Sequence, residues 1–166
     1  MAYRSRMRLL TLLLRLSGGI VSTAFLAILL PVEWMAATHG WLGLGEFPRA
    51  PIVEYLARSV AALYGFHGVL VLLVSTDPVR YRSFVWYVAF VNVAFGLIVL
   101  AIDIHAGMPL FWTIAEGPPV IGLGIVLAAL NRGARPPHAA GGAEWMEHQS
   151  SMSEERSRAT GRPSVG

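Results

Sequence analysis

Four apolar runs fill most of the first 130 residues, and short polar or basic connections separate them. Each run is about as long as the roughly 20 residues that a helix needs to cross a hydrocarbon core of about 30 Å. We expect spans at residues 12–33, 55–75, 84–104 and 110–130. A spanning segment must be helical, because the bilayer core offers no water to free backbone groups, and the runs lack the alternation of transmembrane strands. The pattern predicts an all-α integral membrane four-helix bundle, with a transmembrane domain at residues 12–130.

The composition supports the same class and excludes several functions. Of the 166 residues, 55% are hydrophobic and 14% are charged, which is too apolar for an ordinary soluble domain. The absence of cysteine excludes disulfides and thiolate chemistry. The sequence shows no phosphate-binding loop, no Ser-His-Asp arrangement and no nucleic-acid signature. We therefore expect no catalytic residue and no nucleic-acid partner.

The arginines indicate the orientation. They gather before or early in the first run, in the second connection and after the last run, whereas the third connection (105–108) has none: Arg4, Arg6, Arg8, Arg15, Arg80, Arg82, Arg132 and Arg135. Basic residues mark cytoplasmic ends, so we expect a bacterial cytoplasmic (inner) membrane protein with both termini cytoplasmic and a basic N-terminus at 1–11. Alternatively, the first run is a signal peptide cleaved near Met35. Its length and Arg15 favour a retained helix, with Arg15 reaching the headgroups.

The connections have distinct expected roles. Residues 34–54 combine aromatic side chains with several glycines and prolines, which favours a loop in the outer interface. Pro51 and Pro109 each suit the first turn of a helix, and the second helix is then expected from about 51 to 75. The segment 117–119, Gly-Pro-Pro, is expected to bend or open the fourth helix. Residues 131–166 are expected to form a disordered cytoplasmic tail, in which 143–146 either stays solvated or touches the membrane.

Ionisable residues in the spans form the candidate site. Helical phase and depth place four carboxyls in the outer half of the bundle, near a single cation, Arg58. In a structural interpretation, Arg58 pairs with Asp103 and Glu54 to lock the helices, and Glu33 reaches headgroup water. In a functional interpretation, the groups line an outward-facing polar pocket for a substrate, a proton or a cation. The candidate binding residues are Glu33, Glu54, Arg58, Asp103, Glu116 and Trp112.

The histidines suggest no cofactor. His67 and Asn92 lie at similar depth, but His67 points away from the side of its helix that carries Arg58. If Arg58 meets Asp103, His67 is not expected to meet Asn92, and Asn92 is expected to form an interhelical hydrogen bond. Haem ligation needs two histidines at matching depth on facing helices, but His39 and His105 lie near the outer surface and His67 is alone in the middle. A metal site of His39, His105 and nearby carboxylates would lack a diagnostic spacing. We expect no cofactor and no metal.

Three short motifs lie at comparable positions in the predicted helices. They are Arg15-Leu16-Ser17-Gly18 in the first, Arg58 entering a second helix with Gly65 and Gly68, and Gly107-Met108-Pro109 followed by Glu116 in the fourth. In these motifs the chain resembles the DoxX-like group of small four-helix bacterial membrane proteins, over residues 12–130. Glu33 departs from the basic residue that several relatives carry after the first helix, and the outer connection is longer. The resemblance implies the fold, and some relatives are linked to quinone-coupled oxidation or redox stress.

Two classes of function follow as expectations. The first is a non-catalytic accessory or small-molecule-binding module, whose partners are the lipid bilayer and either a membrane protein or a lipid-soluble small molecule. The alternative is a membrane oxidoreductase component that handles a quinone or another lipid-soluble substrate. In it, Glu116 or Asp103 carries the proton, and Trp34 and Trp112 form the pocket walls. Proton or cation translocation ranks last, because the inner halves of the helices offer almost no polar path.

Overall fold

The computed structural model describes residues 2–133, 149–152 and 155, and this part of the chain contains helices and no strand. The helices are α1 (Ala2–Ser22), α2 (Phe25–Leu29), α3 (Val32–Trp41), α4 (Pro51–Val74), α5 (Arg82–Ala106) and α6 (Leu110–Arg132). Residues 1–134 form one compact unit and 135–166 a second. In the second unit, residues 149–152 and 155 are helical. Most of the predicted tail, including 143–146, lies outside the described residues.

Four helices are long and apolar enough to cross a membrane: Tyr3–Leu29, Pro51–Val74, Arg82–Ala106 and Leu110–Arg132. The first differs from the expected span of 12–33. It begins inside the basic N-terminal segment and ends before Pro31, because Leu30 adopts the extended conformation (φ −65°, ψ 131°) that a residue before proline prefers. Glu33 therefore belongs to the short helix α3, and not to the first long helix as expected.

The other boundaries follow local signals in the sequence. Pro51 occupies the first turn of α4, as expected. Gly107 ends α5 with a positive φ of 67°, and the amide of Met108 donates to the carbonyl of Asp103 at 2.9 Å. This closure satisfies a carbonyl at the helix end, and α6 begins directly after Pro109. The Gly-Pro-Pro segment at 117–119 was expected to bend or open the fourth helix; α6 stays a single helix through Pro118 and Pro119, so it is not interrupted there.

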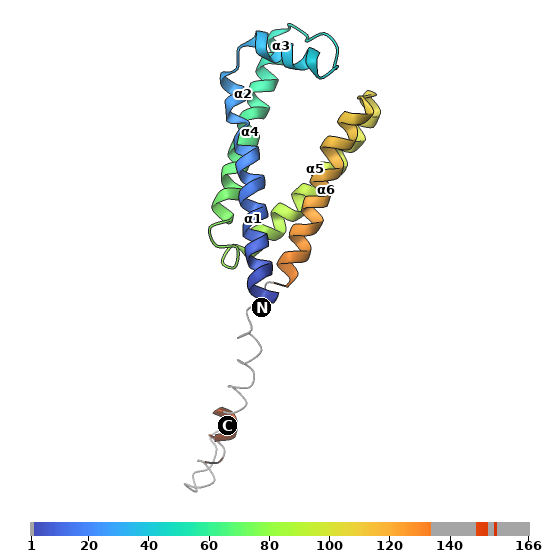
Figure 1. Cartoon of the computed structure of the whole chain (residues 1–166). Coiled ribbons are helices and arrows are strands. Elements are labelled where there is room, and N and C mark those ends of the chain that lie inside the picture. The colour runs from blue at the N-terminus through green and yellow to red at the C-terminus, as the bar shows by residue number, and fades with distance from the viewer. Residues whose placement is uncertain (1, 134–148, 153–154, 156–166) are drawn as a thin grey trace, which may run out of the picture. The chain divides into compact units, whose positions relative to one another are not determined.

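The first unit is built from two antiparallel pairs of helices (Figure 1). In one pair α1 and α2 pack against α4, and in the other α5 packs against α6. Glycines bring each pair together: a Cβ at Gly68 would lie 2.4 Å from the Ser22 nitrogen, and a Cβ at Gly96 would lie 2.8 Å from the Gly117 oxygen. Small residues at such seams let helix backbones approach closely.

The pairs join each other at one end. This end, where α1 begins and α6 ends, is called the terminal end here, and the opposite end the α3 end. The shared core lies at the terminal end and consists of Leu10, Leu14, Val71, Val74, Val85, Val88, Ala89 and Leu127. Toward the α3 end the pairs diverge (Figure 1), and α4 makes only slight contact with α5.

The exterior of the long helices is apolar. Ile20, Leu63 and Phe90 are 70%, 71% and 70% exposed, and many other large apolar side chains are exposed on the same helices. Surface of this kind, in contact with water, is an aggregation liability. In a bilayer it meets lipid tails, so the exterior agrees with helices of membrane-spanning length.

Candidate binding cavity between the helix pairs

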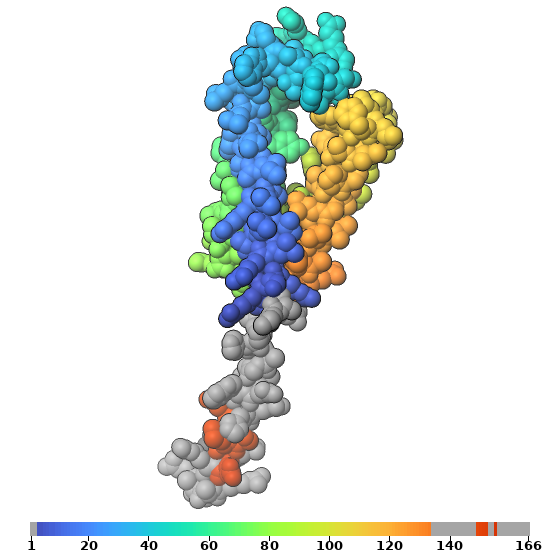
Figure 2. Space-filling model, viewed as in Figure 1, coloured from blue at the N-terminus to red at the C-terminus, as the bar shows by residue number. Residues whose placement is uncertain are grey.

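A cavity of about 520 Å³ opens where the two pairs separate. All four long helices contribute to its wall: Val21 from α1; Val60, Leu63, Tyr64 and His67 from α4; Val91, Asn92 and Phe95 from α5; and Val120 from α6. Figure 2 shows the hollow between the two pairs. The small-residue seams lie within each pair, whereas branched and aromatic side chains face each other across the pairs. The cavity follows from this difference.

Three polar side chains interrupt the apolar wall. Tyr64 and His67 are three residues apart, so they lie on one face of α4. Asn92 reaches the same cavity from α5. His67 and Asn92 were expected to stay apart if Arg58 met Asp103, and this condition is not met, since no such ion pair joins the two described residues.

The polar groups of the wall retain hydrogen-bonding capacity. The Asn92 side-chain nitrogen donates to the Val88 carbonyl of its own helix at 2.8 Å. Within the described residues no hydrogen bond joins Asn92 to another helix, so the expected interhelical bond is absent there, and the amide oxygen and second N–H remain for the cavity. The His67 ring forms no hydrogen bond within the part of the chain that the structure describes. The wall thus presents an imidazole, an amide and a phenol to a ligand.

An aromatic contact lies in the wall of the cavity. The rings of Tyr64 and Phe95 meet edge to face, with centroids 5.9 Å apart. Since Tyr64 belongs to α4 and Phe95 to α5, this contact joins the two pairs where their backbones have already separated.

Arg58 contacts residues other than the expected Asp103. Its Nε donates to Glu54 Oε1 at 3.0 Å, and its Nη2 lies 2.8 Å from the same oxygen. The guanidinium also donates to the carbonyl of Leu30 at 3.2 Å and to that of Ile28. The predicted ion pair with Asp103 is absent, although the structure describes both residues. Arg58 joins the end of α2 to α4.

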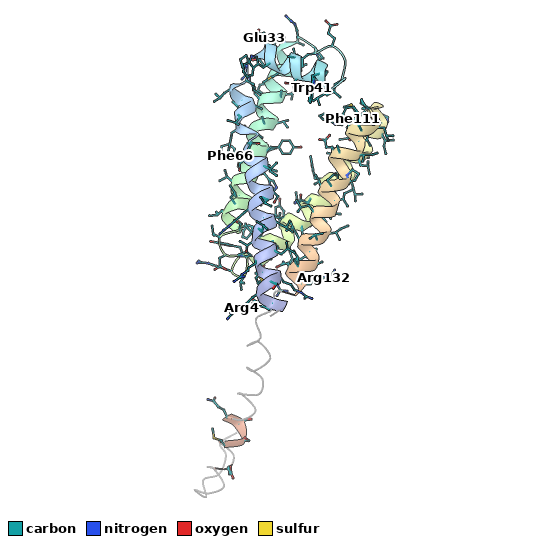
Figure 3. All side chains as sticks on the ribbon, viewed as in Figure 1. Arg4, Glu33, Trp41, Phe66, Phe111 and Arg132 are labelled. Carbon is teal, nitrogen blue, oxygen red and sulfur yellow. The ribbon has the colours of Figure 1, made fainter. Side chains whose placement is uncertain are left out.

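The remaining members of the predicted pocket lie apart. Asp103 is 5% exposed, and its Oδ2 has no hydrogen-bond partner among the described residues. Glu33 is exposed on α3 (Figure 3), and Trp112 is half-buried in the first turn of α6. Within the described chain no hydrogen bond or ion pair joins these residues or Glu116 to the Glu54–Arg58 pair. Of the six predicted residues, the structure therefore brings together Glu54 and Arg58.

The residues that line the cavity were only partly visible in the sequence. The sequence indicated His67 and Asn92 as polar groups at similar depth, whereas it did not predict a role for Tyr64 or Phe95. The spacing of Tyr64 and His67, one helical turn apart in an apolar run, was the available signal.

Metal ligation has no evident place in the described structure. Across residues 2–133, 149–152 and 155, no three His, Asp or Glu side chains lie close enough together to hold a metal ion. His39 packs edge to face on Phe47, with ring centroids 5.5 Å apart, and its Nδ1 lies 3.2 Å from the Gly45 oxygen. His105 is exposed at the end of α5.

Comparisons of the chain with models of protein families, with curated proteins and with solved structures gave no match. The chemistry of the cavity therefore follows from its own residues.

Proposed function

We propose that the chain is a multi-pass protein of the bacterial cytoplasmic membrane that binds a lipid-soluble small molecule between its two helix pairs. Both termini are cytoplasmic in this proposal, so the α3 end faces outward. The protein acts as a binding or accessory module. The observation that supports the proposal most is the shared cavity of His67 and Asn92, set in an otherwise apolar wall.

The chemistry of the cavity indicates the class of ligand. Binding sites for small molecules usually enclose about 300–1,000 Å³, with apolar walls and a few polar groups that fix orientation, and the 520 Å³ cavity has this form. His67, Asn92 and Tyr64 can all donate hydrogen bonds. Such a wall suits a flat apolar molecule that carries carbonyl or hydroxyl groups, as a quinone does.

The gap between the pairs provides a route to the cavity. Because α4 and α5 make only slight contact, a molecule dissolved in the bilayer reaches the wall laterally without crossing water. This access suits a ligand that partitions into lipid rather than a water-soluble metabolite.

Binding of decylubiquinone to the full chain in lipid nanodiscs tests the proposal. Isothermal titration calorimetry measures the affinity, and empty nanodiscs correct for partitioning. We expect His67→Leu and Asn92→Leu each to weaken binding about three- to tenfold, the effect of losing one hydrogen bond. We expect Val120→Phe, which fills the cavity, to weaken binding further.

Two matched controls accompany these variants. His105→Leu removes an exposed histidine, and Val126→Phe enlarges an exposed valine outside the cavity wall. Neither is expected to change the affinity. Equal effects of the cavity variants and their controls, or binding no stronger than in empty nanodiscs, would refute a quinone-like ligand in this cavity.

The second candidate is a component of a membrane oxidoreductase, because a cavity that suits a quinone as a ligand also suits it as a substrate. In that function Glu116 carries a proton to or from the bound molecule. Glu116→Gln would then lower quinone-dependent turnover in native membranes while the decylubiquinone affinity stays within about twofold. A binding module shows no such loss of turnover.

A further inference from the structure

A second cavity of about 410 Å³ forms a groove along the α5–α6 pair. Small residues form its floor and larger apolar residues its sides: Ala89, Gly124, Ala128 and Ala129, with Trp86, Phe90, Val93 and Ile125. A Cβ at Gly124 would lie 2.7 Å from the Ala89 oxygen, so the helix backbones touch and leave a furrow above them. The sides are open, since Phe90 is 70% and Ile125 57% exposed.

Arg132 forms one end of this groove. Its guanidinium lies over the Trp86 ring, 5.8 Å from the ring centroid, and the side chain is exposed in the last turn of α6. Figure 3 shows Arg132 at the same end of the unit as Arg4. The groove is therefore apolar along its length and cationic at the terminal end.

Further arginines surround this end of α6. Arg82 Nη2 lies 3.4 Å from the Asn131 carbonyl, and the Arg6 guanidinium lies against Gly133. Within residues 2–133, the acidic side chain of the terminal end is Asp77, which already accepts a hydrogen bond from the Arg80 amide at 3.0 Å. The other acidic residues of this range belong to the α3 ends of their helices or to the adjoining loop. The charge at the end of the groove thus complements an anion.

We propose that this groove binds an anionic phospholipid of the cytoplasmic leaflet. Its phosphate lies beside Arg132 and one acyl chain lies along the furrow. From Trp86 to Val93 the groove runs about 10 Å along α5, at 1.5 Å per residue, which fits within the roughly 15 Å depth of one leaflet. Arginine matches phosphate with two parallel N–H groups, and tryptophan favours the headgroup level. A free phosphate ion would use only the arginine.

Native mass spectrometry of the full chain tests this proposal. The protein is released from nanodiscs that contain equal amounts of phosphatidylglycerol and phosphatidylcholine, both with palmitoyl and oleoyl chains. We expect the wild type to retain phosphatidylglycerol preferentially. Arg132→Gln should lower this retention about fivefold, as expected for one arginine at an anionic surface, and Ala129→Leu should lower it by obstructing the furrow.

The matched controls are Arg80→Gln and Ala101→Leu, which change an exposed arginine and an exposed alanine outside the groove. Retention in both should equal that of the wild type. The proposal is overturned if the controls lose as much lipid as the groove variants, or if both lipids are retained equally. If Arg132→Gln lowered the retention of phosphatidylglycerol but Ala129→Leu did not, and if inorganic phosphate displaced the lipid, the arginine would bind an anion without an acyl chain in the furrow. This result would exclude a lipid site. This proposal depends on the proposed membrane location, but not on a ligand in the cavity between the helix pairs. The result of the decylubiquinone experiment therefore does not test it.

Discussion

The guanidinium of Arg58 supplies the partners that the backbone loses where α2 ends. The chain turns at Leu30 and Pro31, so carbonyls of the last helical turn have no amide within the helix to accept from. Arg58 donates to the Ile28 and Leu30 carbonyls and at the same time to Glu54. Arg58, which the sequence predicted to be a binding residue, therefore connects α2 to α4.

Arg58→Leu is expected to destabilise the protein by about 1–3 kcal/mol, because it removes the hydrogen bonds from a charged donor to two partly buried carbonyls. Arg58→Lys should lose less, since it keeps the charge beside Glu54 but lacks the fork that reaches two carbonyls. The free energy of unfolding in mixed micelles measures both effects.

Arg49→Leu is the control for this prediction, because Arg49 is exposed in the loop before α4. Its unfolding free energy should match the wild type. If Arg58→Leu lowered the unfolding free energy no more than Arg49→Leu, the contacts of Arg58 between α2 and α4 would contribute nothing to stability.

The sequence predicted least well which side chains of the site contact each other. The helical phase of Arg58 and Asp103 was compatible with a pair, but phase says only which way a side chain points from its own helix. Whether α4 and α5 approach at that depth depends on packing elsewhere, and they separate there. Because the Arg58–Asp103 pair does not form, the condition under which His67 and Asn92 were expected to stay apart is not met, and both residues line one cavity.

At the scale of the helices, glycine position decides which helices touch. In the seam between α1 and α4, a Cβ at Gly68 would meet the Ser22 nitrogen at 2.4 Å, whereas a Cβ at Gly19 meets nothing within 4 Å. Two glycines of neighbouring helices thus have opposite roles. One allows close packing, and the other only weakens its own helix.

Gly68→Ala is therefore expected to lower the unfolding free energy by about 1–3 kcal/mol, the usual effect of overpacking. Gly19→Ala should raise it by about 0.5–1 kcal/mol, because alanine restricts the unfolded backbone and favours helix. Unfolding in mixed micelles measures both. Changes of the same sign in the two variants would contradict the assigned seam.

The presence of the long helices was easier to predict than the residues at which they begin and end. Four runs of sufficient length and hydropathy indicated four long helices, and Pro51 correctly marked the start of α4. The apolar character of residues 12–33 hid the break at Pro31, because hydropathy does not register a backbone turn. Pro118 and Pro119 were expected to bend or open the fourth helix, and α6 continues through both without an interruption.

For the whole molecule, the distribution of arginines supports the proposed topology. In the proposed orientation the terminal end, with its core and most of its basic residues, faces the cytoplasm. The loop between α3 and α4 then faces outward, and the connection between α4 and α5 faces inward.

Cysteine labelling tests this topology. The chain has no cysteine, so Glu46→Cys and Thr76→Cys, both at exposed positions, each introduce a single thiol. A membrane-impermeant maleimide should label Glu46→Cys in intact cells and Thr76→Cys only after lysis. Labelling of Thr76→Cys in intact cells, or the reverse pattern, would invert or exclude the assigned orientation.

The divergence of the two pairs also bears on the shape of the surrounding bilayer. The helices are bound by a common core at the terminal end and spread apart toward the α3 end. Such a unit occupies more lateral area in one leaflet than in the other, as a wedge does. In the proposed orientation the wider side lies in the outer leaflet, so the protein should favour membrane that bulges outward, such as the cell poles, over flat or inwardly curved membrane.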